Sequence, residues 1–417
     1  MKTFPLSDPH EHSDYPRPLN KYARFFNKLL CYVAVATAFF LPLSTSITDL
    51  LFILCPLLFC LSGQYKERLQ FIWERRAIFF CVILFTWMLI GVTYTEAPLK
   101  ESFMGLNKYS KLLLGVFFAP VFREEKWRRY ALNGFFLAII ITIIAALFKD
   151  IGFLHQEKFG RFLIFKDRIQ TSFLMAMAAY FSLLLYLEQT KKVPRWIYAL
   201  IFLLSVFFLF STDGRSGYII FCLLFIWLLW SRWRWKGIIY AFFSIAIIAL
   251  TAYFFSPAFN GRLQESIHDI RVFQSGQDNT SLGLRAEFVK NSLQLIKQHP
   301  IFGAGTGSFG SRYISLSVPD YLRTNNPHNQ YVYVWVQWGL LGLILLLWVF
   351  YVQWHDSQLL ASPMRQITQG LVISIAIGSL ANSWLLDTTE GHFYVYFIAL
   401  TFASQVKVKT ILSSFTH

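Results

Sequence analysis

Long apolar runs separated by short polar linkers repeat along almost the whole chain. A helix that crosses a bilayer needs about 20 mainly apolar residues, and this pattern predicts about twelve membrane-spanning helices. The first two runs have almost no polar residues between them, so we expect a tight helical hairpin there. The predicted spans are residues 29–46, 47–63, 77–94, 109–122, 131–148, 169–188, 197–212, 217–230, 238–255, 332–353, 367–386 and 393–406.

One polar stretch, residues 256–331, is much longer than the other linkers and lies between the ninth and tenth predicted spans. It is long enough for a small helical subdomain, and functional residues are disproportionately found in such loops. The pattern therefore predicts an all-α integral membrane protein. Its parts are a tail at 1–28, nine spans within 29–255, the long loop at 256–331, three spans within 332–406, and a second tail at 407–417.

Composition supports a membrane protein over a soluble one. Hydrophobic residues make up 55% of the 417 positions and charged residues only 15%, against roughly 25% charged residues in an average soluble domain. So few charges could not cover the apolar surface of a soluble chain of this length.

The formal net charge of +15 could suggest a nucleic-acid partner. In membrane proteins, however, Lys and Arg accumulate in short cytoplasmic loops. Here they gather before the first span and in alternate linkers, at residues 66–76, 123–129, 191–195 and 232–236. The charge is therefore interpreted as a topology signal with no nucleic-acid partner. It predicts that both termini are cytoplasmic, that the long loop faces the other side, and that the surrounding partners are membrane lipids.

Arg215 is the first candidate for chemistry. It lies in a turn of glycine and serine between two apolar runs, on the side where short loops rarely contain arginine. A charge this close to hydrocarbon suggests a functional site. The alternative is a snorkelling side chain that pairs with Asp213 or with a lipid phosphate.

Arg285 is the second candidate. Apolar residues with helical spacing predict a helix that Thr280 or Ser281 caps and that His299-Pro300 ends. We expect Arg285 in the first turn, where a cation opposes the helix dipole unless it faces an anion. The alternative is a surface arginine paired with Glu287 or Asp278.

His328 is the third candidate. Asn326 is predicted to cap the helix that follows, with Pro327 at its first position and His328 in its first turn. The helix dipole would keep the imidazole neutral there and able to act as a base. A purely structural histidine is the alternative.

Two further motifs are interpreted as structural. The run 305–310 matches GxGxxG but does not follow a predicted strand, so its glycines are expected to allow a tight backbone turn instead of binding a nucleotide. Asp387 and Glu390 fall in another outward turn, where we favour solvated carboxylates over acceptor-binding ones. No DxD or HxxH pattern predicts a divalent-metal site on that face.

Two arginines, a neutral histidine and no predicted metal ligands suggest a site that binds a lipid diphosphate at the outer membrane surface. The arginines would stabilise the diphosphate as it leaves. The histidine would take a proton from an incoming hydroxyl.

The chain resembles the bacterial O-antigen ligases, within the wider O-antigen ligase and polymerase superfamily. The resemblance covers the whole length, including the predicted spans and the long loop before the last three. Three motifs carry it in this order: the Arg215-Ser216-Gly217 turn, the loop-helix segment 281–285 followed by 299–305, and Pro327-His328-Asn329-Gln330-Tyr331.

The resemblance implies a GT-C-like membrane fold and an inverting, metal-independent glycosyltransferase without a cofactor. Such an enzyme moves a completed glycan from undecaprenyl diphosphate to lipid A–core on the periplasmic face of the inner membrane. It implies that Arg215 and Arg285 bind the diphosphate and that His328 activates the acceptor hydroxyl. Ser216, Gly217 and Asn329 would complete the substrate site.

The GT-C pattern often places a catalytic carboxylate in the first outward loop. Here that loop is only a few residues around Ser44–Asp49, so an acidic base is not expected there.

Three rival functions remain. An O-antigen polymerase or a protein O-oligosaccharyltransferase would use the same donor and differ only in the acceptor. A flippase or transporter would place ionisable residues along the middle of several spans, whereas these spans are nearly free of charge.

Overall fold

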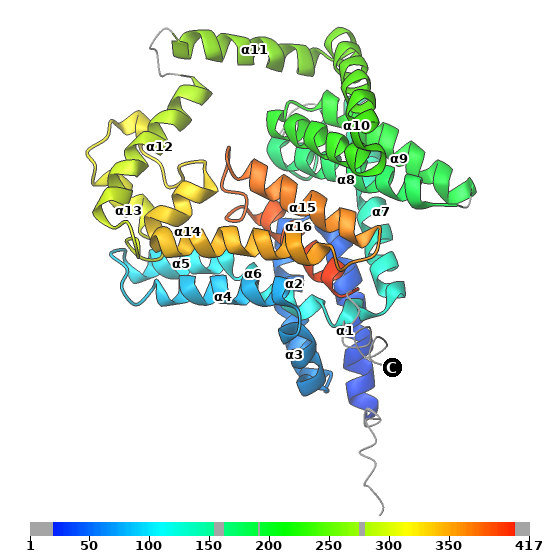
Figure 1. Ribbon diagram of the computed structural model, residues 1–417, viewed down its shortest axis with the longest axis horizontal. Coiled ribbons are helices and arrows are strands. Elements are labelled where there is room, and N and C mark those ends of the chain that lie inside the picture. Colours follow the sequence, from blue (N-terminus) through cyan, green and yellow to red (C-terminus); the bar gives the residue numbers. More distant parts are fainter. Residues whose placement is uncertain (1–19, 154–161, 191, 275–279, 405–417) are drawn as a thin grey trace, which may run out of the picture.

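The computed structural model describes residues 20–153, 162–190, 192–274 and 280–404 (Figure 1). All regular secondary structure in these ranges is helical, as predicted. The elements are α1 (Lys21–Phe40), α2 (Thr45–Leu61), α3 (Tyr65–Trp73), α4 (Arg76–Ile90), α5 (Leu99–Tyr109), α6 (Lys111–Leu114), η1 (Gly115–Phe118), η2 (Val121–Arg123), α7 (Glu125–Asp150), α8 (Arg168–Glu188), α9 (Lys192–Ser211), α10 (Arg215–Phe255), α11 (Pro257–Gln274), α12 (Ser281–Gln298), α13 (Phe309–Ile314), η3 (Asp320–Leu322), α14 (Gln330–Ser357), α15 (Met364–Gly378) and α16 (Thr388–Phe402).

Five of the described helices, α1, α7, α8, α10 and α14, are long and apolar enough to cross a membrane. Three shorter apolar helices lie at Thr45–Leu61, Arg76–Ile90 and Arg195–Ser211. These helices are those of a multi-pass membrane protein, and the count of twelve spans stays a prediction. The predicted hairpin is present, because only residues 41–44 separate α1 from α2 and the two helices contact each other.

Helix α10 is broken at Arg234, whose φ of 51° and ψ of −131° are not helical. The break falls inside the basic linker 232–236, so the predicted spans 217–230 and 238–255 are the two arms of α10. Gly237 makes the break possible, since a Cβ there would lie 2.0 Å from the carbonyl oxygen of Leu229. The two arms run in different directions (Figure 1).

The segment predicted as a span at 109–122 is not one helix. It is divided between the end of α5, α6, η1 and η2. Lys111 explains part of this division: its side chain is buried, and its ammonium donates to the carbonyl oxygens of Leu386 and Asp387, at 3.3 and 2.6 Å. The lysine thus ties this segment to the turn that precedes α16.

The glycine-rich loop 299–308 inserts its backbone into a break of α14 at Gly339 (φ 65°, ψ −168°). The amide of Gly305 donates to the carbonyl of Gln337 at 2.8 Å. Gly303, Gly305 and Gly307 all have positive φ, of 75°, 88° and 82°, a region that glycine adopts at no steric cost. The predicted tight backbone turn is confirmed for Gly305 and Gly307, whereas Gly310 of the same run lies in α13.

The predicted long loop is helical in its described parts, with α11, α12, α13 and η3. Thr280 caps α12 by accepting from the amide of Gly283 at 3.1 Å, and the helix ends before His299, as predicted. Helix α11 lies at the edge of the molecule, between α10 and α12 in the chain (Figure 1).

Helix α16 is at the centre of the bundle, and its residues 389–402 are buried. Phe393 packs against Phe135 of α7 and against Phe173 and Phe181 of α8, with ring centroids 5.3–6.0 Å apart. Such aromatic packing fixes α16, and with it the turn 379–387 that leads into it.

Candidate functional site

Arg215 is the first residue of α10, directly after the Thr212–Gly214 turn. The glycines of this turn let α8 approach closely: a Cβ on Gly214 or Gly217 would lie 2.2 or 2.4 Å from side-chain atoms of Ser172. Gly217 thus has a packing role, and its part in substrate binding, like that of Ser216, stays a prediction.

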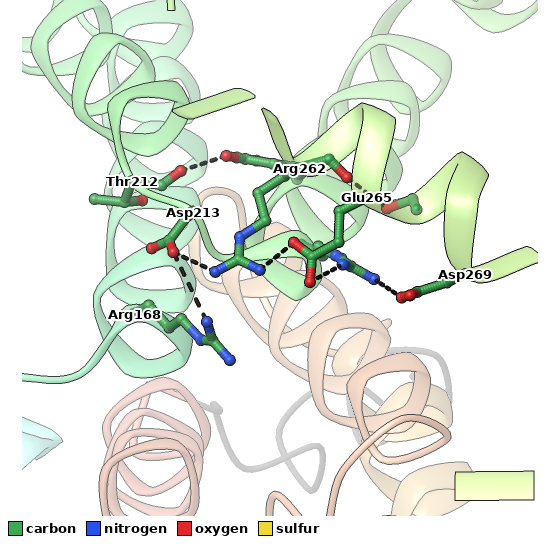
Figure 2. A network of polar contacts seen from close by, with 9 residues as sticks. Arg168, Thr212, Asp213, Arg262, Glu265 and Asp269 are labelled. Carbon is green, nitrogen blue, oxygen red and sulfur yellow. Dashed lines mark hydrogen bonds and ion pairs between the residues drawn. The ribbon is translucent and has the colours of Figure 1, made fainter. Parts of the chain in front are cut away.

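The Arg215 guanidinium pairs with two carboxylates of α11, Glu265 at 3.0 Å and Asp269 at 2.9 Å. Asp213, the partner considered from the sequence, contacts Arg262 and lies 3.8 Å from Arg168 instead. Figure 2 shows this network, in which Arg262 lies between Asp213 and Glu265. The charge of Arg215 is therefore balanced by α11.

Two carboxylates of this network, Asp213 and Glu265, have a pKa below the usual value and are ionised at neutral pH. Partial burial of Asp213 acts to raise its pKa, but the hydrogen bond and the charge of Arg262 hold that pKa below its usual value. Any anion that binds here competes with carboxylates that already occupy the arginines.

Arg285 is the fifth residue of α12 and so begins its second turn, not its first. Its side chain is half-buried and makes no ion pair within the described ranges, and the nearby Glu287 pairs with Lys290 at 2.9 Å. Asp278, the other partner considered, lies outside these ranges. Burial, followed by the charges of Arg215 and Arg168, lowers the pKa of Arg285. Among the described residues, Arg285 is thus a cation without an acidic partner, close to two other arginines.

His328 does not lie in the first turn of α14, which was the expectation. Asn329 caps α14 by accepting from the amides of Tyr331 and Val332, at 3.0 and 3.1 Å. His328 precedes this cap in a left-handed conformation (φ 53°). Asn326, the predicted cap, accepts from the His328 amide at 2.9 Å. The dipole argument for a first-turn histidine therefore does not apply.

Asn329, predicted to bind substrate, uses both ends of its amide within the protein. Its Oδ1 caps α14, and its Nδ2 donates to the carbonyl of Leu380 at 3.1 Å. Its role in binding stays a prediction.

The His328 ring has two neighbours. Its Nδ1 lies 3.0 Å from Oδ1 of Asn382. The ring also stacks on Phe288 of α12, with centroids 6.0 Å apart and planes inclined by 30°. Phe288 follows Arg285 by three residues, so both lie on one face of α12. Helix α12 thus brings the unpaired arginine and the histidine to the same site.

Glu390 is not solvated, which corrects the sequence interpretation of that residue, and Asp387 is only partly exposed. Glu390 is 1% exposed, and neither of its carboxylate oxygens has a hydrogen-bond partner within the described residues. Asp387 accepts from Nδ2 of Asn382 at 3.0 Å. The Glu390 carboxylate turns inward because α16 is buried from Thr389 onward.

Asp49, the fifth residue of α2, contacts Nε2 of His392 at 3.3 Å. The first outward turn thus does supply a carboxylate, but its contact is with α16 and not with His328. Within the described residues, no group of three or more His, Cys, Asp or Glu side chains is arranged to hold a metal ion.

An apolar cavity of about 580 Å³ lies between α9 and the second arm of α10, with Leu203, Phe207, Ile247 and Phe255 in its walls. A polar cavity of about 500 Å³ shares Phe162, Ser211, Pro257 and Ala258 with it and is lined also by Asp213, Arg262 and Glu265. A long apolar chain with a polar head could lie along these two cavities and reach the ion-pair network.

Sequence reasoning missed Asn382 and the α11 residues Arg262, Glu265 and Asp269. The spacing of Glu265 and Asp269 by four residues, which puts both on one helical face, could have indicated a shared partner. No sequence signal distinguished Asn382 from other loop asparagines.

Comparison with known proteins identifies one family and one relative. Residues 199–347 match the family described as O-antigen ligase, and this segment contains Arg215, Arg285 and His328. The chain is also 26% identical over 303 residues to an uncharacterized protein of Haemophilus influenzae, covering 68% of this chain and 72% of that protein. The resemblance to the O-antigen ligase family is confirmed, and it supports a membrane-bound transferase of the ligase or polymerase type.

Proposed function

We propose that this chain, with its O-antigen ligase segment at residues 199–347, transfers a glycan from undecaprenyl diphosphate to lipid A–core on the periplasmic face of the inner membrane. One observation carries the proposal. Arg285 is half-buried without an acidic partner in the described ranges, close to Arg215 and Arg168, and on the same helical face as the phenylalanine that stacks on His328. An anion site therefore adjoins a potential base.

The chemistry is a single displacement. A hydroxyl oxygen of the acceptor attacks the anomeric carbon of the glycan from the side opposite the diphosphate. The bond between that carbon and the phosphate oxygen breaks, and its electron pair leaves with undecaprenyl diphosphate. Nε2 of His328 takes the hydroxyl proton. One displacement inverts the configuration at the anomeric carbon.

Arg285 and Arg215 stabilise the negative charge that develops on the leaving diphosphate. Guanidinium groups suit this role because they stay charged and bind phosphate oxygens in a bidentate manner. Positive charge placed in advance where the transition state develops negative charge lowers the barrier without rearrangement during the reaction. No step in this scheme is routed through a metal ion.

The two cavities beside α9 and α10 support a lipid-linked donor. The apolar cavity suits a polyprenyl chain, because its walls are almost wholly hydrophobic. Its polar neighbour is lined by Asp213, Arg262 and Glu265, and Glu265 pairs with Arg215 at 3.0 Å. A donor placed along them has its tail toward lipid and its diphosphate toward the arginines.

The test is complementation of a deletion strain, with lipopolysaccharide analysed by gel electrophoresis. We expect the deletion to leave unmodified core while long glycan accumulates on the lipid carrier. Wild type should restore the ladder, and Arg285→Ala and His328→Ala should not. A matched control is Arg323→Ala in the same loop, because Arg323 is exposed and its one ion pair among the described residues is with Asp320, at 3.0 Å.

Other outcomes identify the rivals. A core that carries a single repeat unit in the deletion strain would indicate a polymerase. Loss of glycan from a protein, with lipopolysaccharide unchanged, would indicate a protein O-oligosaccharyltransferase. A normal ladder with both variants would overturn the proposed site.

A further inference from the structure

We propose that Asn382 and Asp387 are positioning residues that fix the tautomer of His328, so that Nδ1 carries the proton and Nε2 is the free base. This inference rests on the proposed function for its catalytic meaning. Its structural content, a chain of two hydrogen bonds from Asp387 through Asn382 to His328, is independent of the reaction.

Asp387 determines which groups donate and which accept in these two hydrogen bonds. Its Oδ2 lies 3.0 Å from Nδ2 of Asn382. An ionised carboxylate only accepts hydrogen bonds, so the amide must turn its NH₂ group toward Asp387. This fixes the orientation of the Asn382 side chain, which is otherwise ambiguous for an amide.

The amide oxygen of Asn382 then faces His328, at 3.0 Å from Nδ1. A carbonyl oxygen cannot donate, so Nδ1 must carry the hydrogen. A neutral imidazole has one N–H, which leaves the lone pair on Nε2. Nε2 is thereby the nitrogen that can take a proton from an acceptor hydroxyl.

The backbone around His328 is held so that the ring cannot turn away. Its amide donates to Oδ1 of Asn326 at 2.9 Å, and Ser383 donates to the same oxygen at 2.7 Å. The ring also stacks on Phe288. The left-handed conformation of His328 is uncommon for a residue other than glycine, and such conformations cluster at functional sites.

Asp387 is held from the other side. Its backbone carbonyl accepts from the buried ammonium of Lys111 at 2.6 Å. The carboxylate also lies in the fields of Lys111 and Lys108, which favour its ionised form, and of Asp167, which opposes it. The carboxylate of Glu390, three residues later in the sequence, also interacts electrostatically with that of Asp387.

An amide between carboxylate and imidazole has a chemical consequence. A carboxylate in direct contact with the ring would favour imidazolium, which cannot accept a proton. Asn382 orients the ring without adding a negative charge next to it. An asparagine also serves as the third member of the Cys-His-Asn triad of papain-like proteases.

The first test reads the tautomer directly. Full-length protein with isotope-labelled histidine is compared with His328→Gln to identify the His328 signal by NMR. We expect the Nδ1–H tautomer in wild type and a mixture of both tautomers in Asn382→Leu. An Nε2–H tautomer in wild type, or an unchanged signal in Asn382→Leu, would overturn the proposal.

The second test is kinetic and uses purified protein with lipid-linked glycan and lipid A–core. In Asn382→Leu we expect kcat to fall roughly 10²-fold, at the lower end of what a general base contributes, with KM little changed. Asp387→Asn, which keeps the size of the side chain, should give a smaller fall. Ser379→Ala is the matched control, because its buried hydroxyl has no partner within the described residues and it precedes Asn382 by three positions.

The two tests separate the two proposals. If wild type transfers no glycan, the proposed function fails, and the tautomer still decides whether Asn382 and Asp387 orient His328. If wild type is active and Asn382→Leu keeps its kcat while remaining monodisperse, the positioning role is wrong and the proposed function stands.

Discussion

The arginine region and the histidine region of the site are built in opposite ways. Arg215 is held by the charges of Glu265 and Asp269, on a helix at the edge of the molecule, while Arg285 has no such partner in the described ranges. His328 is held by neutral hydrogen bonds and by ring stacking, next to the central helix α16. Long charged side chains can adapt to a diphosphate, whereas a base must already point at its proton. The positive charge of the site and the orientation of its base are therefore supplied by separate parts of the fold.

Loss of the base should have the largest effect. In His328→Gln, which can donate a hydrogen bond but not take a proton, we expect the transfer rate to fall roughly 10³-fold, within the range for general-base catalysis. Binding of inorganic pyrophosphate, measured by calorimetry, should be unchanged. A His328→Gln variant with normal activity would show that His328 is a phosphate ligand and not a base, and the contrast between the two regions would disappear.

Removal of the unpaired cation should come next. For Arg285→Ala we expect kcat to fall by about 10²-fold, as when one donor to a developing anion is removed. Arg285→Lys should retain more of the wild-type kcat than Arg285→Ala but not all of it, because lysine lacks the bidentate geometry of arginine. Rates and pyrophosphate affinities of both variants, measured beside Arg323→Ala, would check this. Equal activity of the alanine variant and the control would mean that Arg285 is a surface arginine.

The pH dependence should separate the two regions further. Burial raises the pKa of Asp387 to about 6. The ionised form supports the hydrogen-bond chain, so this support is present above that pKa and is lost as the pH falls through it. The ratio of wild-type to Asp387→Asn activity should therefore decline roughly tenfold between pH 7.5 and 5, since each unit below a pKa lowers the ionised fraction tenfold. A constant activity ratio would show that the ionisation of Asp387 does not support the hydrogen bonds to His328.

The smallest effect is expected from the carboxylates of α11. Glu265→Gln with Asp269→Asn removes the two ion pairs of Arg215. The pair with Glu265 is partly exposed, and such pairs are worth roughly 0.2–1 kcal/mol. We expect pyrophosphate to bind a few times more tightly, with a steeper dependence on salt. Weaker binding would instead show that these carboxylates orient Arg215. Glu287→Gln, which removes a carboxylate paired with Lys290 in α12, is the control.

Local sequence signals predicted the fold well where neighbours decide the structure. Thr280 caps α12, the basic linker contains the break at Arg234, and the loop glycines have positive φ. In each case the residues that determine the conformation lie within a few positions of one another. Helix periodicity and capping rules act over this range.

The site was predicted less completely because its contacts are distant in sequence. Arg215 and Asp269 are 54 positions apart, as are His328 and Asn382. Asn326 and Asn329 both precede α14. Oδ1 of Asn326 accepts from Ser383 and from the His328 amide, and Asn329 is the residue that caps the helix. The roles of Arg215, Arg285 and His328 stay predictions, and their distant partners could not be predicted from local sequence signals.

The glycine loop in the break of α14 has a consequence for biogenesis. Its backbone pairs with Gln337 on one side, and the Thr306 amide donates to the carbonyl of Gly91 on the other, at 3.0 Å. Gly91 is synthesised long before Gln337, so the loop cannot make both contacts until α14 has left the ribosome. A nascent chain that stops earlier leaves these backbone groups unpaired, which is costly wherever water is excluded. The glycine loop therefore completes its backbone pairing only after α14 has been synthesised and has left the ribosome.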